Sequence, residues 1–290
     1  RILDTASGSK AAIGSGFLVS NDGHIITNYH VISGMIDRPE LYRAEFRTHD
    51  ENSGQLQILD VDVVHDLALL KAEGLSDVLG EPSLRDQSFE ISTQNPANGV
   101  RLYAMGNPFD LGLTIVEGTY NGLWEKSLYE KIHFTGSINP GMSGGPTLDS
   151  RGRVVGVNVS TAGNQVSFLV PAKYAAALLN RVKKNGAAQN LVLQVRDQQL
   201  ANQETYITRL LADPLKTLHI KGYRAPGELA SFIDCWSDTE TAEEQLYDTA
   251  YQSCTSSDDI YLSDEQATGM IQYRHEVYRS RGLDQLRFYR

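Results

Sequence analysis

The sequence predicts a mostly β protein followed by a small, mainly helical C-terminal region. Between Phe17 and Val170, short runs of β-branched and apolar residues recur between Gly, Asn, Asp and Pro, as expected for antiparallel strands joined by tight turns. The alanine-rich run 172–184 then has the composition of a helix and is followed by an Asn-Gly stop signal. Beyond it, residues 186–290 carry 10 Lys and Arg against 16 Asp and Glu, so the composition becomes acidic.

The first expected strands place a histidine near a strand end. Residues 14–20 and 24–31 are β-rich runs joined by an Asp-Gly turn, and His30 lies near the end of the second run. Such a histidine, taken alone, is more often a solvated or core-edge residue than a catalytic one. Asp66 directly precedes the apolar run 67–71 and, taken alone, is a turn residue at a strand edge.

A serine lies between glycines in the stretch 141–146, Gly-Met-Ser-Gly-Gly-Pro. Glycines allow the backbone to turn tightly enough for successive N–H groups to converge on one point, toward which the Ser143 hydroxyl projects. These letters suit a nucleophile beside an oxyanion hole, but they also suit a glycine-rich hairpin turn with an incidental serine. A base and a carboxylate upstream favour the nucleophile.

His30, Asp66 and Ser143 have the residue types of a catalytic triad and are 36 and 77 positions apart. Serine is a weak nucleophile at neutral pH, so an imidazole must accept its proton and return it to the leaving amine. A carboxylate holds the other ring nitrogen and stabilises the imidazolium. The order His, Asp, Ser is the chymotrypsin-like order. We therefore predict a serine endopeptidase that acts through an acyl-enzyme.

Over roughly residues 8–185, the chain resembles the trypsin-like serine peptidases, in their HtrA/DegP-like branch. The resemblance rests on five stretches, which are residues 14–31, 65–70, 104–109, 138–146 and 167–171.

This resemblance implies a protease domain at residues 1–185, built from two six-stranded antiparallel β-barrels of the chymotrypsin-like kind. The barrels are expected near 8–92 and 98–172, with the helix 172–184 closing the domain. His30 and Asp66 then come from the first barrel and Ser143 from the second, so catalysis depends on how the barrels dock. Residues 186–290 form a region of unknown role.

We expect the oxyanion hole to be built from backbone groups of the serine loop. The N–H groups of Gly141 and Ser143 are the candidate donors, and the N–H of Met142 between them is a further candidate.

The resemblance also locates a substrate pocket, because in trypsin-like enzymes the residue six before the serine lies at the pocket base. That residue is Ser137, and since an unpaired buried ammonium costs several kcal/mol, cleavage after Lys or Arg is not expected. Ile138 stands at the entrance to the loop. The pocket strand is expected to contain Asn158, Val159 and Ser160. We predict a preference for uncharged aliphatic residues.

Composition and charge exclude several partners. The formal net charge of −10 argues against nucleic acid and anionic lipid, and no apolar run approaches the ~20 residues of a membrane span. The chain opens with Arg1 and without a signal peptide, so we expect a processed form of a periplasmic or secreted protein. Protein or peptide substrates are the expected partners. Neither a cofactor nor a metal is predicted.

Cys235 and Cys254 are the only cysteines and are 19 positions apart. The pair is compatible with one disulfide in an oxidising compartment, and two unpaired structural thiols are the alternative. Because no histidine lies nearby, the spacing is poor for a metal site.

Three segments of the C-terminal region have helical patterns, residues 204–211, 241–252 and 263–279, of which the last two begin with capping signals. A PDZ domain, usual in the HtrA/DegP-like branch, would need a glycine-rich carboxylate-binding loop and several strands, so none is expected. The region is a candidate brace, lid or docking module for a second copy or another protein. The alternative to a protease is a catalytically latent or non-catalytic scaffold that acts as a binding or chaperone protein through this region.

Overall fold

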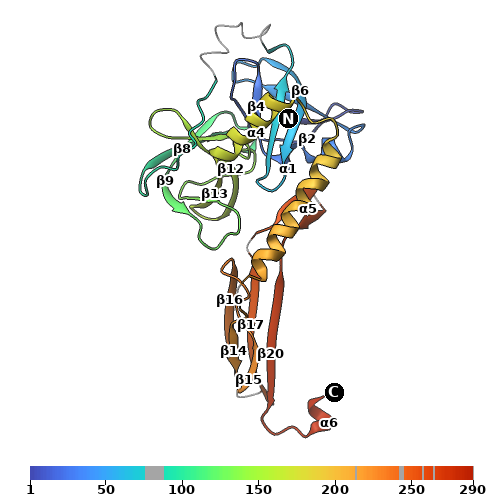
Figure 1. Cartoon of the computed structure of the whole chain (residues 1–290), viewed down its shortest axis with the longest axis vertical. Coiled ribbons are helices and arrows are strands. Elements are labelled where there is room, and N and C mark those ends of the chain that lie inside the picture. Colours follow the sequence, from blue (N-terminus) through green and yellow to red (C-terminus); the bar gives the residue numbers. More distant parts are fainter. Residues whose placement is uncertain (76–87, 213, 242–244, 257, 264, 290) are drawn as a thin grey trace. The chain divides into compact units, whose positions relative to one another are not determined.

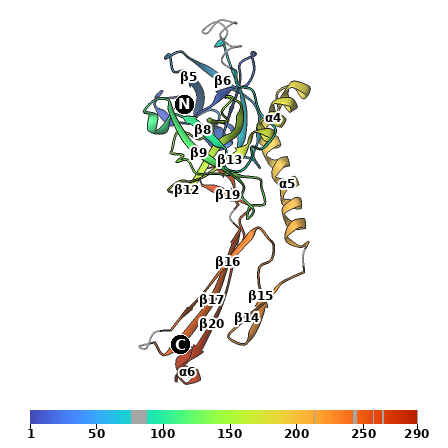
Figure 2. The same ribbon diagram turned by 90° about the vertical axis from the view of Figure 1, so that its left-hand side faces the viewer.

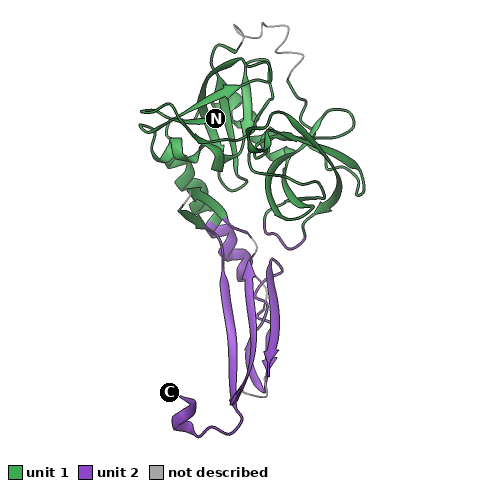
Figure 3. Ribbon diagram, turned by 180° about the vertical axis from the view of Figure 1, so that it is seen from behind, with its two compact units in different colours: residues 1–124, 129–202, 260–267 green, residues 125–128, 203–259, 268–290 purple. Residues whose placement is uncertain are grey.

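A computed structural model of the chain describes residues 1–75, 88–212, 214–241, 245–256, 258–263 and 265–289. They form two compact units (Figure 3). Unit 1 contains Arg1–Trp124, Tyr129–Asn202 and Ile260–Ala267. Unit 2 contains Glu125–Leu128, Gln203–Asp259 and Thr268–Arg290. This division differs from the predicted boundary at residue 185, because unit 1 continues to Asn202 and includes a short segment of the C-terminal region.

The first half of unit 1 is an open, seven-stranded sheet in the order β2-β1-β5-β6-β7-β4-β3. Strands β2, β4 and β6 of this sheet are labelled in Figure 1. The strands are β1 (Ile2–Asp4), β2 (Lys10–Ala12), β3 (Phe17–Leu18), β4 (His24–Thr27), β5 (Tyr42–Arg47), β6 (Ser53–Asp62) and β7 (Leu67–Ala72). A closed six-stranded barrel was expected near 8–92, of which residues 76–87 lie outside the described residues. The edge strands β2 and β3 are three and two residues long. Among the described residues these two strands do not pair with each other, so the sheet does not close into a barrel.

The interior strand β7, which lies between β6 and β4, is covered on both faces, which explains its largely apolar sequence. Leu67 and Leu69 pack in a cluster with side chains of helix α4 (Ala172–Asn185). Ala68 and Leu70 point to the other face and pack with Tyr29 of helix α1 (Tyr29–Asp37).

The second half of unit 1 is a closed barrel of six strands in the order β10-β13-β12-β11-β8-β9, which confirms the barrel predicted near 98–172. Phe134, Ile132, Leu102 and Leu169 fill it and have no exposed surface. The strands are β8 (Arg101–Gly106), β9 (Thr114–Leu123), β10 (Ile132–Phe134), β11 (Pro146–Leu148), β12 (Val154–Gly163) and β13 (Val166–Pro171), and a short 3₁₀ helix, η1, spans Pro108–Asp110.

Two predicted helices are confirmed. Helix α4 covers the run 172–184, buries residues spaced three and four apart, and ends at Gly186, whose φ of 77° suits a glycine. Helix α5 (Leu191–Leu210) includes the predicted segment 204–211 except for its last residue. None of the described helices is both long and apolar enough to cross a membrane.

Unit 2 is built largely from strands, so the prediction of a mainly helical C-terminal region is wrong. Its principal sheet has the order β16-β17-β20, and a separate pair joins β14 and β15 (Figures 1 and 2). The strands are β14 (Thr217–Ile220), β15 (Tyr223–Pro226), β16 (Ile233–Glu240), β17 (Tyr247–Ser256) and β20 (Gln272–Ser280), and a terminal helix, α6, spans Gln285–Phe288.

The two helices expected at 241–252 and 263–279 are replaced by β17 and by β18 (Ile260–Ser263), β19 (Gln266–Thr268) and β20. Residues 242–244 and 264 of those ranges lie outside the described residues. Burial alternates residue by residue over most of β20, which is the period of a strand. Residues that favour sheets occur in both strands, Tyr and Thr in β17 and Tyr and Val in β20. The capping signals at their starts therefore did not mark helices.

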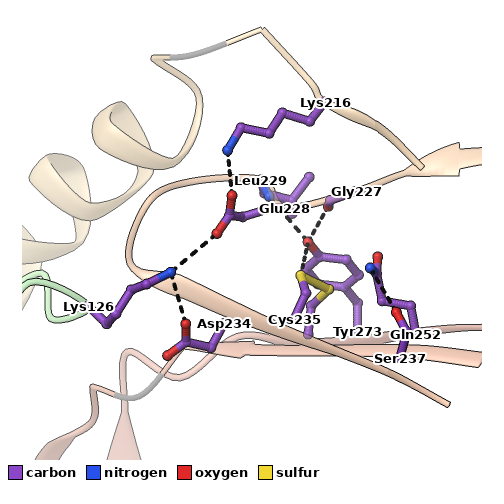
Figure 4. The surroundings of a disulfide bond; sticks show 11 residues. Lys126, Lys216, Gly227, Glu228, Leu229, Asp234, Cys235, Ser237, Gln252 and Tyr273 are labelled. Atoms are coloured by element: carbon purple, nitrogen blue, oxygen red, sulfur yellow. Dashed lines mark hydrogen bonds and ion pairs between the residues drawn. A yellow bond between two sulfur atoms is a disulfide. The ribbon is translucent and has the colours of Figure 1, made fainter.

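The sole cysteines of the chain form a disulfide across β16 and β17, where Cys235 and Cys254 are directly opposite each other. Beside it, the Tyr273 hydroxyl donates to the carbonyl of Gly227 (Figure 4). Lys126 lies 3.1 Å from Asp234 and 3.6 Å from Glu228 in the same unit. Of the two alternatives, a disulfide and two unpaired thiols, the structure contains the disulfide.

Candidate active site

His30 and Asp66 meet because adjacent strands end side by side. β4 pairs with β7 so that Thr27 lies opposite Ala68. His30 follows β4 in the first turn of α1, and Asp66 directly precedes β7. The Asp66 Oδ2 atom is 2.6 Å from His30 Nδ1, and Oδ1 accepts a 2.8 Å hydrogen bond from the His30 backbone N–H. Both carboxylate oxygens of Asp66 are therefore engaged by the same residue.

The backbone of Asp66 is left-handed, with a φ of 53°, which is uncommon for a residue with a side chain. Two donors hold its carbonyl oxygen, the Asn28 side-chain amide at 2.8 Å and the Tyr29 N–H at 3.2 Å. These bonds compensate for the conformational cost and turn the carboxylate back toward α1. The carboxylate thereby fixes both the position and the ring orientation of His30.

Ser143 is a central residue of the second of two consecutive turns. The Met142 N–H donates to Asn139 O at 3.0 Å, with Pro140 and Gly141 at the centre, and Gly141 has a φ of 96°. The Gly145 N–H then donates to Met142 O at 3.0 Å, and Gly144 has a φ of 83°. A proline at the second turn position or a positive φ at the third is typical of type II turns.

Neighbouring atoms leave no room for side chains at these glycines. A Cβ atom on Gly141 would lie 2.4 Å from Asn107 O, and one on Gly144 would lie 2.2 Å from Thr27 Oγ1. The glycines therefore allow both the turn conformation and the close approach of the serine loop to the N-terminal sheet.

Ser15 joins the serine loop to the rest of unit 1, a role that the sequence analysis did not assign. Its hydroxyl donates to Gly141 O at 2.7 Å and accepts from the Asn107 N–H at 2.9 Å. Its own N–H donates to Ser143 O at 2.8 Å. The only sequence signal for this role is the Gly-Ser-Gly context of residues 14–16.

Asn158 braces the loop from the barrel side, which differs from its expected place in a substrate pocket. The side chain is fully buried and donates to Met142 O at 3.2 Å and to Met105 O at 2.9 Å. Its Oδ1 accepts a 2.6 Å bond from Thr147. All of these bonds are to protein groups, because a buried amide needs internal partners.

The amides of the loop divide into two groups. The N–H of Met142 is used within the first turn, which removes it as the further oxyanion donor that the sequence suggested. In the described part of the chain, the N–H groups of Gly141 and Ser143 donate to no protein acceptor. These are the two amides that the sequence analysis named first.

Of the other expected pocket residues, Ser137 and Ile138 lie in the segment between β10 and β11, and Val159 and Ser160 lie on β12. Ser137 is half-buried, and Ile138 is 4% exposed and packs in the barrel core. The Ile138 N–H donates to the Ser167 hydroxyl at 3.2 Å. On β12, Val159 is half-buried and Ser160 is exposed. Ile138 is thus largely withdrawn into the core.

Comparisons with known proteins give one family over this part of the chain. A model of the trypsin-like peptidase domain matches residues 14–157. The probable periplasmic serine endoprotease DegP-like of Marinomonas sp. (strain MWYL1) is 30% identical over 205 residues, covering 68% of this chain and 41% of that protein. The chloroplastic protease Do-like 5 of Arabidopsis thaliana is 34% identical over 172 residues, covering 55% of this chain and 51% of that protein.

A solved structure described as that of Deg5 is 30% identical, with a TM-score of 0.53, and the match covers 64% of this chain and 89% of that one. The chain spans about half or less of the length of the curated relatives that it matches first.

Replacing Ser15 with Ala removes the hydroxyl that bridges Gly141 and Asn107. Each such bond contributes about 1 kcal/mol, so we expect hydrogen exchange of the loop amides of Met142 and Gly145 to accelerate about 5- to 10-fold. Hydrogen–deuterium exchange with mass spectrometry of peptides covering 137–145 measures the effect. Ser150→Ala, at an exposed turn, is the matched control and should leave the loop unchanged. Equal exchange in the two variants would contradict the bridging role.

Proposed function

This chain belongs to the trypsin-like peptidases, with relatives of the HtrA/DegP type, and we propose that it is a serine endopeptidase acting on protein substrates. The observation that carries the proposal is the Asp66–His30 pair at 2.6 Å in the same unit as Ser143, which lies in the second of two consecutive glycine-containing turns. Their order along the chain is that of the trypsin-like peptidases.

In the proposed mechanism, the protonated Nδ1 of His30 donates its hydrogen bond to the Asp66 carboxylate. The Nε2 atom is then the basic nitrogen, and it accepts the proton of the Ser143 hydroxyl as Oγ attacks the substrate carbonyl. His30 returns this proton to the leaving amine, and the acyl-enzyme forms on Ser143. Water, deprotonated by His30, then hydrolyses the acyl-enzyme. The carboxylate of Asp66 stabilises the imidazolium in both steps.

The N–H groups of Gly141 and Ser143 are the proposed donors to the developing oxyanion. Loss of one such donor typically costs about 2.7–4 kcal/mol of transition-state stabilisation. Because these donors are backbone groups, their direction depends on the two turns and on the hydrogen bonds from Ser15 and Asn158 that hold the loop. The loop conformation is therefore part of the catalytic machinery.

For the substrate pocket, we retain Ser137 at the base and Val159 and Ser160 along the strand. No charged side chain is among them, so the site suits an uncharged residue before the cleaved bond. Asn158 is assigned to bracing the loop, as its hydrogen bonds indicate.

We further propose that the protein works in a periplasmic or otherwise oxidising compartment. The Cys235–Cys254 disulfide supports this location, because such bonds persist where thiols are not kept reduced. Some relatives are named periplasmic and others chloroplastic.

Substitution of Ser143 by Ala removes the nucleophile and should lower the cleavage of casein or of a fluorogenic peptide by about 10⁴-fold or more. Ser150→Ala, which makes the same change at an exposed turn, should cleave as fast as the wild type. Equal cleavage by the wild type and Ser143→Ala would reject the assignment of Ser143. Binding of substrate without any turnover by the wild type would support a non-catalytic scaffold.

A set of peptides that differ only in the residue before the cleaved bond tests the pocket. With Val, Leu or Ala at that position we expect kcat/KM to exceed that with Arg by at least ~100-fold, because a cation would lose its hydration without gaining a partner. Peptides with Glu should also be poor substrates. Fastest cleavage after Arg or Glu would contradict the proposed pocket.

A further inference from the structure

A short segment of the C-terminal region is part of unit 1. Strands β18 and β19 pair with each other, and residues 260–267 belong to unit 1. The strands that flank them in sequence, β17 and β20, pair in unit 2, with Thr255 opposite Gln272. We call residues 260–267 the inserted segment. Both of its ends are therefore continuous with strands of one sheet.

The inserted segment packs on helix α1, which carries His30. Ile260 is 2% exposed and lies in the same hydrophobic cluster as Tyr29 and Ile32 of that helix. The Tyr29 hydroxyl donates to Leu262 O at 3.3 Å. Burial, with Tyr261 as the next largest cause, raises the pKa of Tyr29 to about 12, so this hydroxyl remains a donor at neutral pH. Apolar packing and a hydrogen bond both fix the segment in place.

Tyr261 brings its ring against the ring of His30. The two ring centroids are 5.8 Å apart at an interplanar angle of 69°, an edge-to-face contact. Tyr29 also contacts Tyr261, and the centroids of these two rings are 6.5 Å apart. Aromatic rings favour this geometry because of their quadrupoles. The imidazole thus has Asp66 at Nδ1 and an aromatic ring beside it.

We propose that Tyr261 is a positioning residue for His30, supplied by the C-terminal region. A hydrogen bond at Nδ1 alone leaves the imidazole able to rotate about its side-chain bonds while it accepts and returns the serine proton. The Tyr261 ring fills space into which it would swing, so the base keeps the orientation that Asp66 sets. This inference rests on the proposed function, in which His30 is the general base.

The test compares Tyr261→Ala, Tyr261→Leu and Tyr261→Phe in the full-length chain. Phe keeps the ring, whereas Leu keeps apolar volume for the segment without a ring. We expect kcat for peptide hydrolysis to fall about 5- to 10-fold in the Ala and Leu variants, with KM changed less than twofold, and to stay near the wild-type value in Tyr261→Phe. Tyr223→Ala, in a 65% exposed tyrosine of unit 2, is the control and should be unaffected.

A second readout does not depend on turnover. The proton shared by His30 Nδ1 and Asp66 in their 2.6 Å bond should give a low-field proton NMR signal, identified by its loss in His30→Ala. We expect this signal in the wild type and in Tyr261→Phe, and expect it to broaden in Tyr261→Leu and Tyr261→Ala. If the wild type cleaves no substrate and yet the signal depends on the ring, the proposed function fails and the positioning role stands.

Four results would overturn the proposal. They are an unchanged kcat and NMR signal in both ring-less variants, an increase in activity, a rise in KM alone, and an equal loss in Tyr261→Phe. An increase would identify the segment as inhibitory, and a rise in KM alone would make Tyr261 a substrate contact. Thermal unfolding of each variant shows whether it is folded, and Tyr261→Leu decides the outcome if Tyr261→Ala unfolds.

Discussion

The hydrogen bonds of Ser15 are the interaction on which the candidate site depends. His30 and Asp66 lie at strand ends of the N-terminal sheet, while Ser143 lies on a loop of the barrel. Ser15 bonds to the backbone on both sides of Ser143, through Gly141 O and Ser143 O. The close approach that these bonds require also explains Gly144, where any Cβ would collide with Thr27. Ser15, which precedes strand β3, thus links the serine loop to Asn107 of the barrel and to Thr27 at the end of strand β4.

The local parts of this site could be predicted from sequence because each is encoded within a few residues. The glycines around Ser143, the strand end before His30 and the turn before β7 are short-range signals. Helix α4 has the spacing of buried residues that a helix requires. The role of Asn158 could not be predicted in this way, since its partners Met105 and Met142 are distant in sequence. Asn158 is fully buried, so its amide bonds to these backbone carbonyls inside the protein.

The C-terminal region was predicted less well, for a physical reason. Its strands are rich in polar residues, so the contrast between apolar and polar positions that distinguishes a strand from a helix is weak. Thr and Ser residues near acidic ones then resemble helix caps, while pairing of β17 with β16 and β20 and the Cys235–Cys254 disulfide determine the observed sheet. The open N-terminal sheet likewise depends on how long its edge strands are, which composition does not reveal. Nor does the sequence show that residues 260–267 belong to unit 1, where Tyr261 contacts His30.

The most direct measurement is covalent labelling of the folded wild-type chain with a fluorophosphonate, followed by peptide mass spectrometry. This reagent reacts rapidly only where a serine, a base and oxyanion donors act together. The account predicts one adduct per chain, located on Ser143, and no adduct in His30→Ala. Absence of labelling, or labelling that persists without His30, would contradict an active triad in this protein.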